Sequence, residues 1–215
     1  MNVNKDRFLL YAVTDRSWAE GTTLCRQVED ALKGGATCIQ LREKNLSRDE
    51  FLQEAIEVKK ICERFQVPLI INDNIEVALR AQADGVHVGQ EDMDAALVRK
   101  KIGKDRILGV TAKTVEQAVL AQKSGADYLG SGAVFGSTTK AGASVLPLDR
   151  LQEICRAVSI PVCAIGGINR DNILRLSGRG ISGVAVVSGI FAAADIQKEC
   201  RELHRLALQV TGGNR

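Results

Sequence analysis

Residues 68–92 read PLIINDNIEVALRAQADGVHVGQED, and this stretch contains the pattern that determines the fold. An apolar run, Pro68 to Ile71, is followed by a polar segment and then by a longer stretch with helical spacing. A second apolar run, Gly85 to Val88, then begins and has its own polar segment after it. Short apolar runs that alternate with longer helical stretches predict repeated βα units with parallel strands.

The same alternation continues in both directions along the chain and yields eight predicted strands. They are Phe8 to Val13, Thr37 to Leu41, Pro68 to Ile71, Gly85 to Val88, Ile107 to Val110, Tyr128 to Gly130, Val162 to Ile165 and Gly183 to Val187. Most are apolar throughout, which suits strands that are covered on both faces. Eight βα units in 215 residues predict an α/β fold, a (β/α)8 TIM barrel in which residues 1–215 form a single domain.

Two of the intervening stretches show clear helix signals. The stretch Arg48 to Phe65 has one broad apolar face, and Ser47 followed by Glu50 predicts a capping box at its start. The stretch Leu148 to Val158 has apolar residues at helical spacing, and Pro161 then opens the next strand. Both are expected to be outer helices of the barrel.

The composition is typical of a soluble globular protein. Hydrophobic residues make up 45% of the chain and charged residues 26%, and the mean hydropathy is −0.03. A net charge of +3 with only 4% aromatic residues argues against nucleic acid as a partner. The mixed charges of Met1 to Arg7 argue against a signal peptide or a spanning helix, so we expect a cytoplasmic protein with no membrane partner.

The six cysteines show no C-x-x-C pair and lie within apolar helix and strand patterns. Short spacings are needed for most metal and redox motifs, and cytosolic thiols are usually reduced. We expect reduced, buried thiols at Cys25, Cys38, Cys62, Cys155, Cys163 and Cys200.

The loops that follow the strands of a TIM barrel carry its chemistry, so the polar residues there are the candidate site. Gln40, Arg42 and Lys44 follow the second strand, and they share one face if the strand continues. An alternative is a solvated strand end at which Glu43 neutralises its neighbours.

Asp73 and Asp92 follow the third and fourth strands. Aspartate at such positions is often a helix N-cap, but carboxylates beside a phosphorylated substrate also suit Mg²⁺. His87 lies between them and is expected to be a structural histidine rather than a metal ligand.

Two glycine-rich regions predict anion binding. The loop from Gly130 to Gly142 combines glycines with Ser137, Thr139 and Lys140, which can donate hydrogen bonds to an anion; the alternative is a lid without specific contacts. Gly166-Gly167 and Val187-Ser188-Gly189 match the phosphate site that barrels build after strands seven and eight. Two anion pockets favour two phosphorylated substrates.

These motifs together resemble the thiamine-phosphate synthase family along nearly the whole chain. The resemblance is carried by Gln40 to Lys44, Asn72-Asp73, Asp84 to Asp92, Ser137 to Lys140 and Ala164 to Ile168. It implies a transferase of thiamine biosynthesis that joins 4-amino-2-methyl-5-hydroxymethylpyrimidine diphosphate to 4-methyl-5-(2-phosphooxyethyl)thiazole. The products are thiamine phosphate and diphosphate, and the implied cofactor is Mg²⁺.

The resemblance also implies the roles of individual residues. Asp73 and Asp92 would hold the metal, and Arg42, Lys44 and Lys140 would be catalytic. Substrate binding is assigned to Gln40, Leu41, Arg42, Glu43, Lys44, Asn72, Thr111, Ser137, Thr138, Thr139, Lys140, Gly167, Val187 and Ser188. The chain departs from the family at Thr111, where serine is usual, and at Gly136-Ser137, where Pro-Thr is usual.

The mechanism we expect is metal-assisted departure of diphosphate, after which the thiazole nitrogen captures a pyrimidine methylene cation. The predicted rim offers cations and metal ligands but no pair of nucleophile and base. One alternative is a related isomerase or thiazole tautomerase, which would bind a single phosphate and need a general base but no metal. Another is a phosphate-binding barrel that senses a ligand without catalysis.

Overall fold

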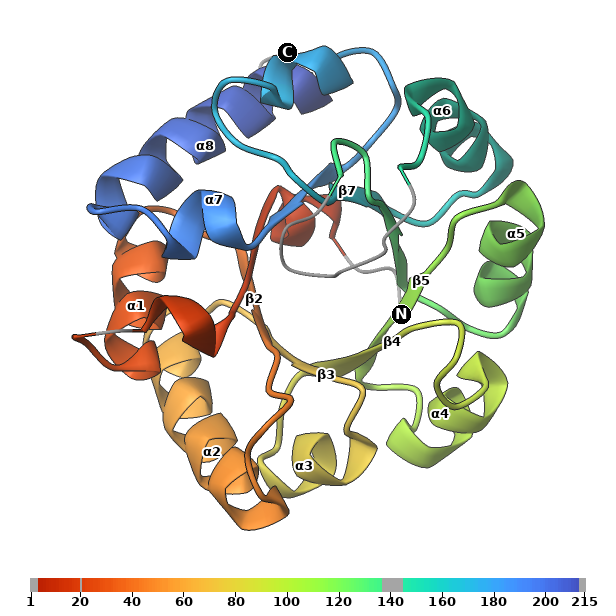
Figure 1. The fold of residues 1–215 in the computed structure, drawn as a ribbon. Coiled ribbons are helices and arrows are strands. Elements are labelled where there is room, and N and C mark those ends of the chain that lie inside the picture. The colour runs from red at the N-terminus through yellow and green to blue at the C-terminus, as the bar shows by residue number, and fades with distance from the viewer. Residues whose placement is uncertain (1–3, 20, 137–144, 213–215) are drawn as a thin grey trace.

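Eight parallel strands form a closed barrel in the computed structural model, which describes residues 4–19, 21–136 and 145–212. Each strand pairs with the next one along the chain, and β8 pairs with β1 to close the ring (Figure 1). The strands are β1 (Leu10–Val13), β2 (Cys38–Leu41), β3 (Leu69–Asn72), β4 (Gly85–Val88), β5 (Ile107–Thr111), β6 (Tyr128–Gly132), β7 (Val162–Ile165) and β8 (Gly183–Val186). The predicted TIM barrel is confirmed, and every predicted strand is present.

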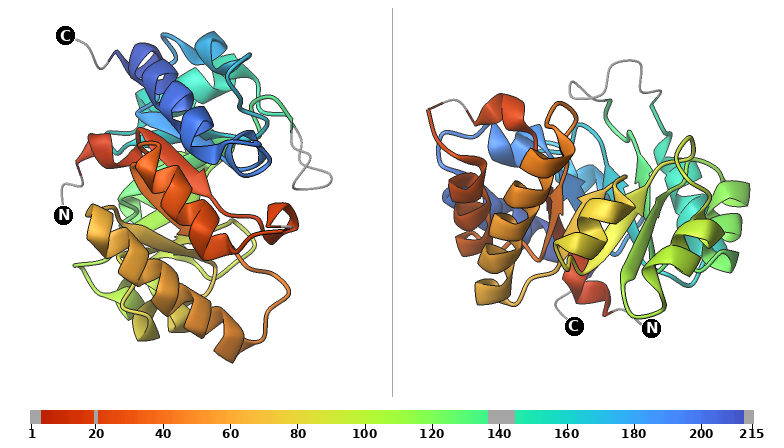
Figure 2. Two further views of the ribbon diagram at one scale, coloured as in Figure 1. Left: turned by 90° about the vertical axis from the view of Figure 1, so that its left-hand side faces the viewer. Right: turned by 90° about the horizontal axis from the view of Figure 1, so that it is seen from below.

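Helices surround the barrel wall and cover its outer face (Figure 2). They are α1 (Leu24–Lys33), α2 (Arg48–Phe65), α3 (Ile75–Arg80), α4 (Ala95–Ile102), α5 (Val115–Lys123), α6 (Leu148–Ala157), α7 (Ser188–Phe191) and α8 (Ile196–Thr211), with the 3-10 helices η1 (Lys5–Phe8), η2 (Arg16–Trp18) and η3 (Ile173–Leu176). The capping box of α2 is confirmed: the Ser47 hydroxyl accepts the Glu50 N–H, and the Glu50 carboxylate accepts the Ser47 N–H. Among the described residues, no helix has the length and apolar composition needed to cross a bilayer.

The seventh connection differs from the expected pattern. Between β7 and β8 the chain forms only the 3-10 helix η3 instead of an α-helix. Gly178 and Gly180 follow it with positive φ angles of 73° and 82°, which end helical structure and turn the chain toward β8. This side of the barrel is covered by α8, which packs on η3.

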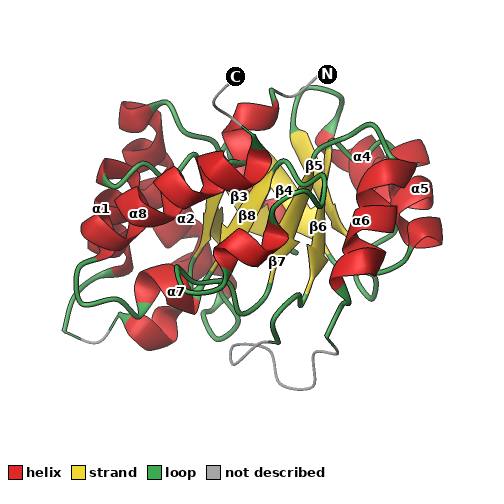
Figure 3. Ribbon diagram, turned by 90° about the horizontal axis from the view of Figure 1, so that it is seen from above, coloured by secondary structure: helices red, strands yellow, loops and turns green. Residues whose placement is uncertain are grey.

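The strand side chains form two hydrophobic clusters, one on each face of the barrel wall. Successive side chains of a strand point to opposite faces, so Tyr11 lies inside the barrel while Leu10 and Ala12 pack outward. Figure 3 shows the strands enclosed by the helices that complete the outer cluster. The inner cluster fills the barrel and consists of Phe8, Tyr11, Val13, Cys38, Ile70, Ile107, Tyr128, Cys163 and Ala185.

The amino-terminal end of the barrel is closed by η1. The strand β1 begins two residues later than predicted because Lys5–Phe8 forms this helix, which the Asn4 side chain caps through the Asp6 N–H (3.0 Å). Phe8 is fully buried, and its ring stacks on Tyr128 with centroids 4.3 Å apart. The helix lies at the bottom of the right-hand view of Figure 2, so the loops that follow the strands form the opposite face.

All six cysteines are free thiols, as expected. Four of them are buried and Cys25 and Cys155 are partly buried. Burial raises the pKa of Cys25 to about 11, so this thiol is protonated at neutral pH and is a poor nucleophile.

Candidate active site

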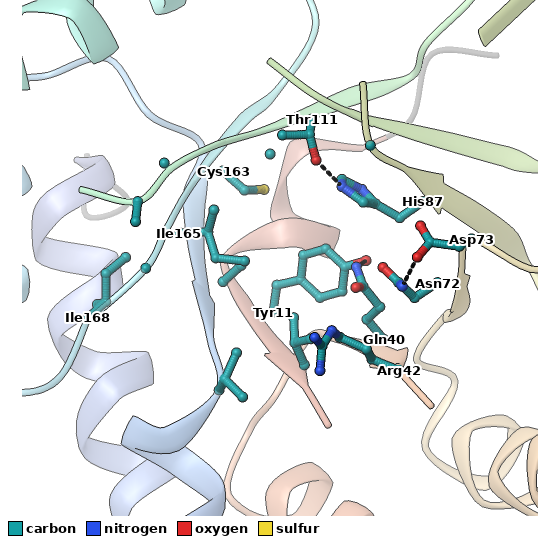
Figure 4. Close-up of a pocket in the computed structure, with 18 of the residues that line it drawn as sticks. Tyr11, Gln40, Arg42, Asn72, Asp73, His87, Thr111, Cys163, Ile165 and Ile168 are labelled. Carbon is teal, nitrogen blue, oxygen red and sulfur yellow. Dashed lines mark hydrogen bonds between the residues drawn. The ribbon is translucent and has the colours of Figure 1, made fainter. Parts of the chain in front are cut away.

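A cavity opens at the carboxyl ends of the strands, above the inner cluster (Figure 4). Its lining comes from all eight strands or from the loops that follow them, as the chemistry of a TIM barrel requires. The lining includes ten of the predicted site residues: Gln40, Arg42, Lys44, Asn72, Asp73, Asp92, Thr111, Gly167, Val187 and Ser188.

Gln40, Arg42 and Lys44 share the cavity face, as the alternation along the second strand predicts. The two intervening residues point elsewhere. Leu41 is fully buried in the outer cluster, and the Glu43 carboxylate pairs with the guanidinium of Arg16 at 3.1 Å. The side chains of Leu41 and Glu43 therefore do not line the cavity, although the sequence included both in the binding set.

The pairing of Glu43 with Arg16 also decides between the two interpretations of this strand end. Among the described residues, Glu43 forms its salt bridge with Arg16, and none joins it to Arg42 or Lys44. Arg42 is held by a hydrogen bond from its N–H to the Thr14 hydroxyl (3.0 Å), and its guanidinium lies 4.0 Å from the Asp15 carboxylate. Two cations thus face the cavity together, which favours an anionic ligand there.

Asp73 and Asp92 do not cap the helices that follow them. The N-cap of α3 is Asn74, whose side chain accepts the Val77 N–H, and the N-cap of α4 is Asp94. The capping interpretation is therefore wrong for Asp73 and Asp92, and both carboxylates are free to line the cavity.

The two carboxylates lie close enough to influence each other. Asn72 donates a hydrogen bond to Asp73 (2.6 Å), and the Gly89 N–H donates to Asp92 (2.7 Å). Burial, together with the neighbouring charge and hydrogen bond of Asp92, raises the pKa of Asp73 from 3.8 to about 6. A bound cation would relieve this repulsion. Among the described residues, no third His, Cys, Asp or Glu side chain joins this pair, so the other ligands of a metal ion here would have to be different groups.

His87 lies on the cavity floor and is hydrogen-bonded at both ring nitrogens. Its Nδ1 is 2.9 Å from the Tyr128 hydroxyl, and its Nε2 is 3.0 Å from the Thr111 hydroxyl (Figure 4). Burial lowers the pKa of His87 to about 4, so the imidazole is neutral at physiological pH. With both nitrogens engaged it has none for a metal, in agreement with the structural role expected from the sequence.

The glycine loops after β7 and β8 lie together on the other side of the cavity. Gly166 and Gly167 have positive φ angles of 102° and 68°, and a Cβ on Gly167 would lie 2.7 Å from the Phe135 carbonyl oxygen. Only glycine can lie this close to the Phe135 carbonyl group. Val187 and Ser188, where α7 begins, line the same cavity. The predicted residues Ser137, Thr138, Thr139 and Lys140 lie outside the described residues.

Two further polar residues line the cavity, and the sequence interpretation selected neither of them. Lys113 follows β5 by two residues, so it carries the same signal as Lys44, a cation just past an apolar run. Tyr11 lies inside β1, and its only sequence signal is a hydroxyl at an inward position of an apolar strand.

Comparisons with known proteins point to one family. Residues 10–190 match the profile of the family described as thiamine monophosphate synthase. The chain is 51% identical over 200 residues to the thiamine-phosphate synthase of Ruminiclostridium cellulolyticum, covering 93% of this chain and 95% of that protein. It is 44% identical over 208 residues to thiamine-phosphate synthase 2 of Streptococcus pneumoniae, covering 95% and 99%.

A solved structure is similar over the same length. Thiamine phosphate pyrophosphorylase from Pyrococcus furiosus superimposes with a TM-score of 0.88 at 36% identity, covering 96% of this chain and 98% of that one. A 3-hexulose-6-phosphate synthase, at 18% identity and a TM-score of 0.68, shares the fold.

Proposed function

We propose a mechanism for this cavity from the premise that the chain belongs to the thiamine monophosphate synthase family. It is a transferase with thiamine-phosphate synthase activity, which joins the aminopyrimidine diphosphate to the thiazole phosphate and releases diphosphate. One C–O bond, between the pyrimidine methylene and the diphosphate, breaks. One C–N bond, between the methylene and the thiazole nitrogen, forms.

The observation that carries the mechanism is the placement of opposite charges on neighbouring strands. Arg42 and Lys44 come from the β2 end, and Asp73 and Asp92 follow β3 and β4 on the same cavity. This arrangement suits a diphosphate that is bound by the cations on one side and by a carboxylate-held cation on the other.

Mg²⁺ fits the pair of Asp73 and Asp92. The ion prefers one or two carboxylates and takes its remaining ligands from substrate phosphate and water. When bound, it would supply positive charge to the departing diphosphate. The raised pKa of Asp73 supports this assignment, because burial and the neighbouring Asp92 disfavour its charged form and a bound cation would favour it.

Positively charged side chains of the protein also bind the leaving group. Arg42 and Lys44 hold the diphosphate and stabilise the negative charge that develops as its bond to the methylene breaks. Lys140 has the same role in our proposal. The chemistry needs no strong general base, so the neutral His87 is not required to move a proton.

The second substrate would enter beside the glycine loops. Gly167, Val187 and Ser188 face the cavity from the β7 and β8 side and can bind the thiazole phosphate through backbone N–H groups and one hydroxyl. Ser137 and Thr139 complete this pocket in our proposal. The thiazole nitrogen would then lie next to the pyrimidine methylene, so that positioning supplies much of the rate.

The test compares Asp92→Asn with Asp94→Asn, two identical changes that are two residues apart. Asp92→Asn removes a metal ligand, and we expect the release of diphosphate to slow by about 100-fold and to need more Mg²⁺. Asp94→Asn alters only the N-cap of α4, where asparagine caps as well as aspartate, so its rate should equal that of the original chain. Undiminished Mg²⁺-dependent turnover in Asp92→Asn would reject the metal assignment.

A further inference from the structure

A continuous chain of hydrogen bonds crosses the barrel interior below the cavity. Gln40 Nε2 donates to the Tyr11 hydroxyl (2.7 Å), which lies 2.7 Å from the Tyr128 hydroxyl. The chain continues from Tyr128 to His87 Nδ1 (2.9 Å) and from His87 Nε2 to the Thr111 hydroxyl (3.0 Å). Its two ends, Gln40 on β2 and Thr111 on β5, lie on different sides of the barrel and both line the cavity (Figure 1 and Figure 4).

The rings in the middle of the chain have little freedom to move. Gly109 lies directly against the Tyr128 ring, and a Cβ there would collide with it. Phe8 stacks on the Tyr128 ring at 4.3 Å, and a Cβ on Gly130 would lie 3.1 Å from His87 Cε1. The two glycines make room for the rings, and the inner cluster holds them in place.

The hydrogen bonds of this chain share one direction when every proton in it is bonded. Each hydroxyl has one proton to donate, and a neutral imidazole has one donor and one acceptor nitrogen. When Gln40 donates to the Tyr11 hydroxyl, the arrangement that bonds every proton of the chain has Tyr11 donating to Tyr128 and Tyr128 donating to His87 Nδ1. His87 then donates from Nε2 to Thr111. Gln40 keeps its carbonyl oxygen and a second amide N–H, and Thr111 keeps its hydroxyl proton.

We propose that this hydrogen-bond chain sets Gln40 as an acceptor and Thr111 as a donor toward the pyrimidine ring, with Tyr11, Tyr128 and His87 as positioning residues. The proposal rests on the proposed function and deepens it. An aminopyrimidine offers amino N–H donors and ring-nitrogen acceptors, which match these two ends. The corresponding oxo-pyrimidine offers an acceptor oxygen in place of the amino group and a ring N–H, so it mismatches both ends. The hydrogen-bond chain thus favours the amino substrate over the oxo analogue.

Tyr128→Phe tests the proposal because it removes the middle hydroxyl and keeps the ring. We expect kcat/KM for the aminopyrimidine diphosphate to fall about tenfold, since polar partners inside the barrel lose their hydrogen bonds. The KM for the thiazole phosphate should stay within about twofold. The preference for the amino substrate over the oxo analogue should shrink by a similar factor, because the ends are no longer coupled.

Two further variants separate positioning from general damage. Ile70→Val removes one methyl group from the same inner cluster and leaves the hydrogen-bond chain intact. It should leave the preference for the amino substrate unchanged. The double variant Tyr11→Phe, Tyr128→Phe should lose no more of that preference than either single variant. Each single change already interrupts the hydrogen bonds that connect Gln40 to Thr111, so the two effects should not add. Turnover by the original chain in the same assay tests the proposed function separately. The proposal would be overturned if Tyr128→Phe left this preference unchanged, whether both substrates lost kcat/KM equally or neither lost any.

Discussion

Asp73 combines an unusual backbone with an unusual charge. Its φ is 60°, in the left-handed region that few residues other than glycine, asparagine and aspartate adopt. Burial and the neighbouring Asp92 raise its pKa to about 6. Neither feature helps the fold by itself, and such features concentrate at functional sites. Both features support the proposed role of Asp73 in binding a metal ion.

The charge of Asp73 predicts a pH-dependent effect of Asp73→Asn on the metal-free protein. The folded pKa of Asp73, about 6, is above its ordinary value of 3.8. Its contribution to stability is thus fully present below that ordinary value and is lost as the pH rises through about 6. We expect Asp73→Asn to raise the melting temperature in chelator at about pH 7.5 and to change it little near pH 4.

Added Mg²⁺ provides the control for this experiment. At about pH 7.5 it should stabilise the original chain and have little effect on Asp73→Asn, because the variant lacks one of the two proposed metal ligands. A melting temperature that Asp73→Asn lowers equally at both pH values would contradict the prediction.

At the scale of elements, two aspartates connect strands and helices at the end of the barrel that is remote from the cavity. Asp84 precedes β4 and accepts the Leu69 N–H (2.8 Å), and Asp127 precedes β6 and accepts the Leu108 N–H (2.8 Å). Each also pairs with a cation from an outer helix, Arg99 of α4 in the case of Asp127. These carboxylates join neighbouring strands and helices at the end of the barrel that is remote from the cavity, where residues serve stability.

Asp127→Asn should therefore lower stability without changing catalysis. We expect a loss of about 2 kcal/mol, the usual range for a hydrogen bond to a charged group, which is measured by urea unfolding. At temperatures where the variant is folded, kcat and both KM values should match those of the original chain. A tenfold lower kcat in the folded variant would show that this end of the barrel influences the site.

At the scale of the whole molecule, the barrel depends on one close approach where β8 meets the start of the chain. Gly183 opens β8, and a Cβ there would collide with the backbone carbonyl of Phe8. This contact lies beside the pairing of β8 with β1, which closes the ring. The first and last strands can pair only because residue 183 has no side chain.

Gly183→Ala should destabilise the closed barrel. The obstacle is backbone rather than a flexible side chain, so we expect a cost of about 3 kcal/mol or more in urea unfolding. Ser182→Ala changes the preceding residue without adding an atom at the contact, and its stability should be nearly unchanged. Equal stabilities for the two variants would show that the strands can shift to accept the extra carbon.

The sequence by itself determined the barrel and which end of it carries the chemistry. Runs of four to six apolar residues separated by helical stretches are local patterns, and polar residues just past such runs must meet at one rim when the strands are parallel. The common face of Gln40, Arg42 and Lys44 follows from the two-residue period of a strand. The capping box at Ser47 is likewise local, since its partners are three residues apart.

Only the tertiary structure decided which contacts each polar side chain makes. Whether Asp73 caps a helix or faces the cavity depends on Asn74 taking the cap, and the partner of Glu43 is Arg16, from a different loop. The bond between Tyr11 and Tyr128 joins residues 117 positions apart. Such contacts depend on strand register and on closure of the ring, which bring together side chains that no local sequence period relates.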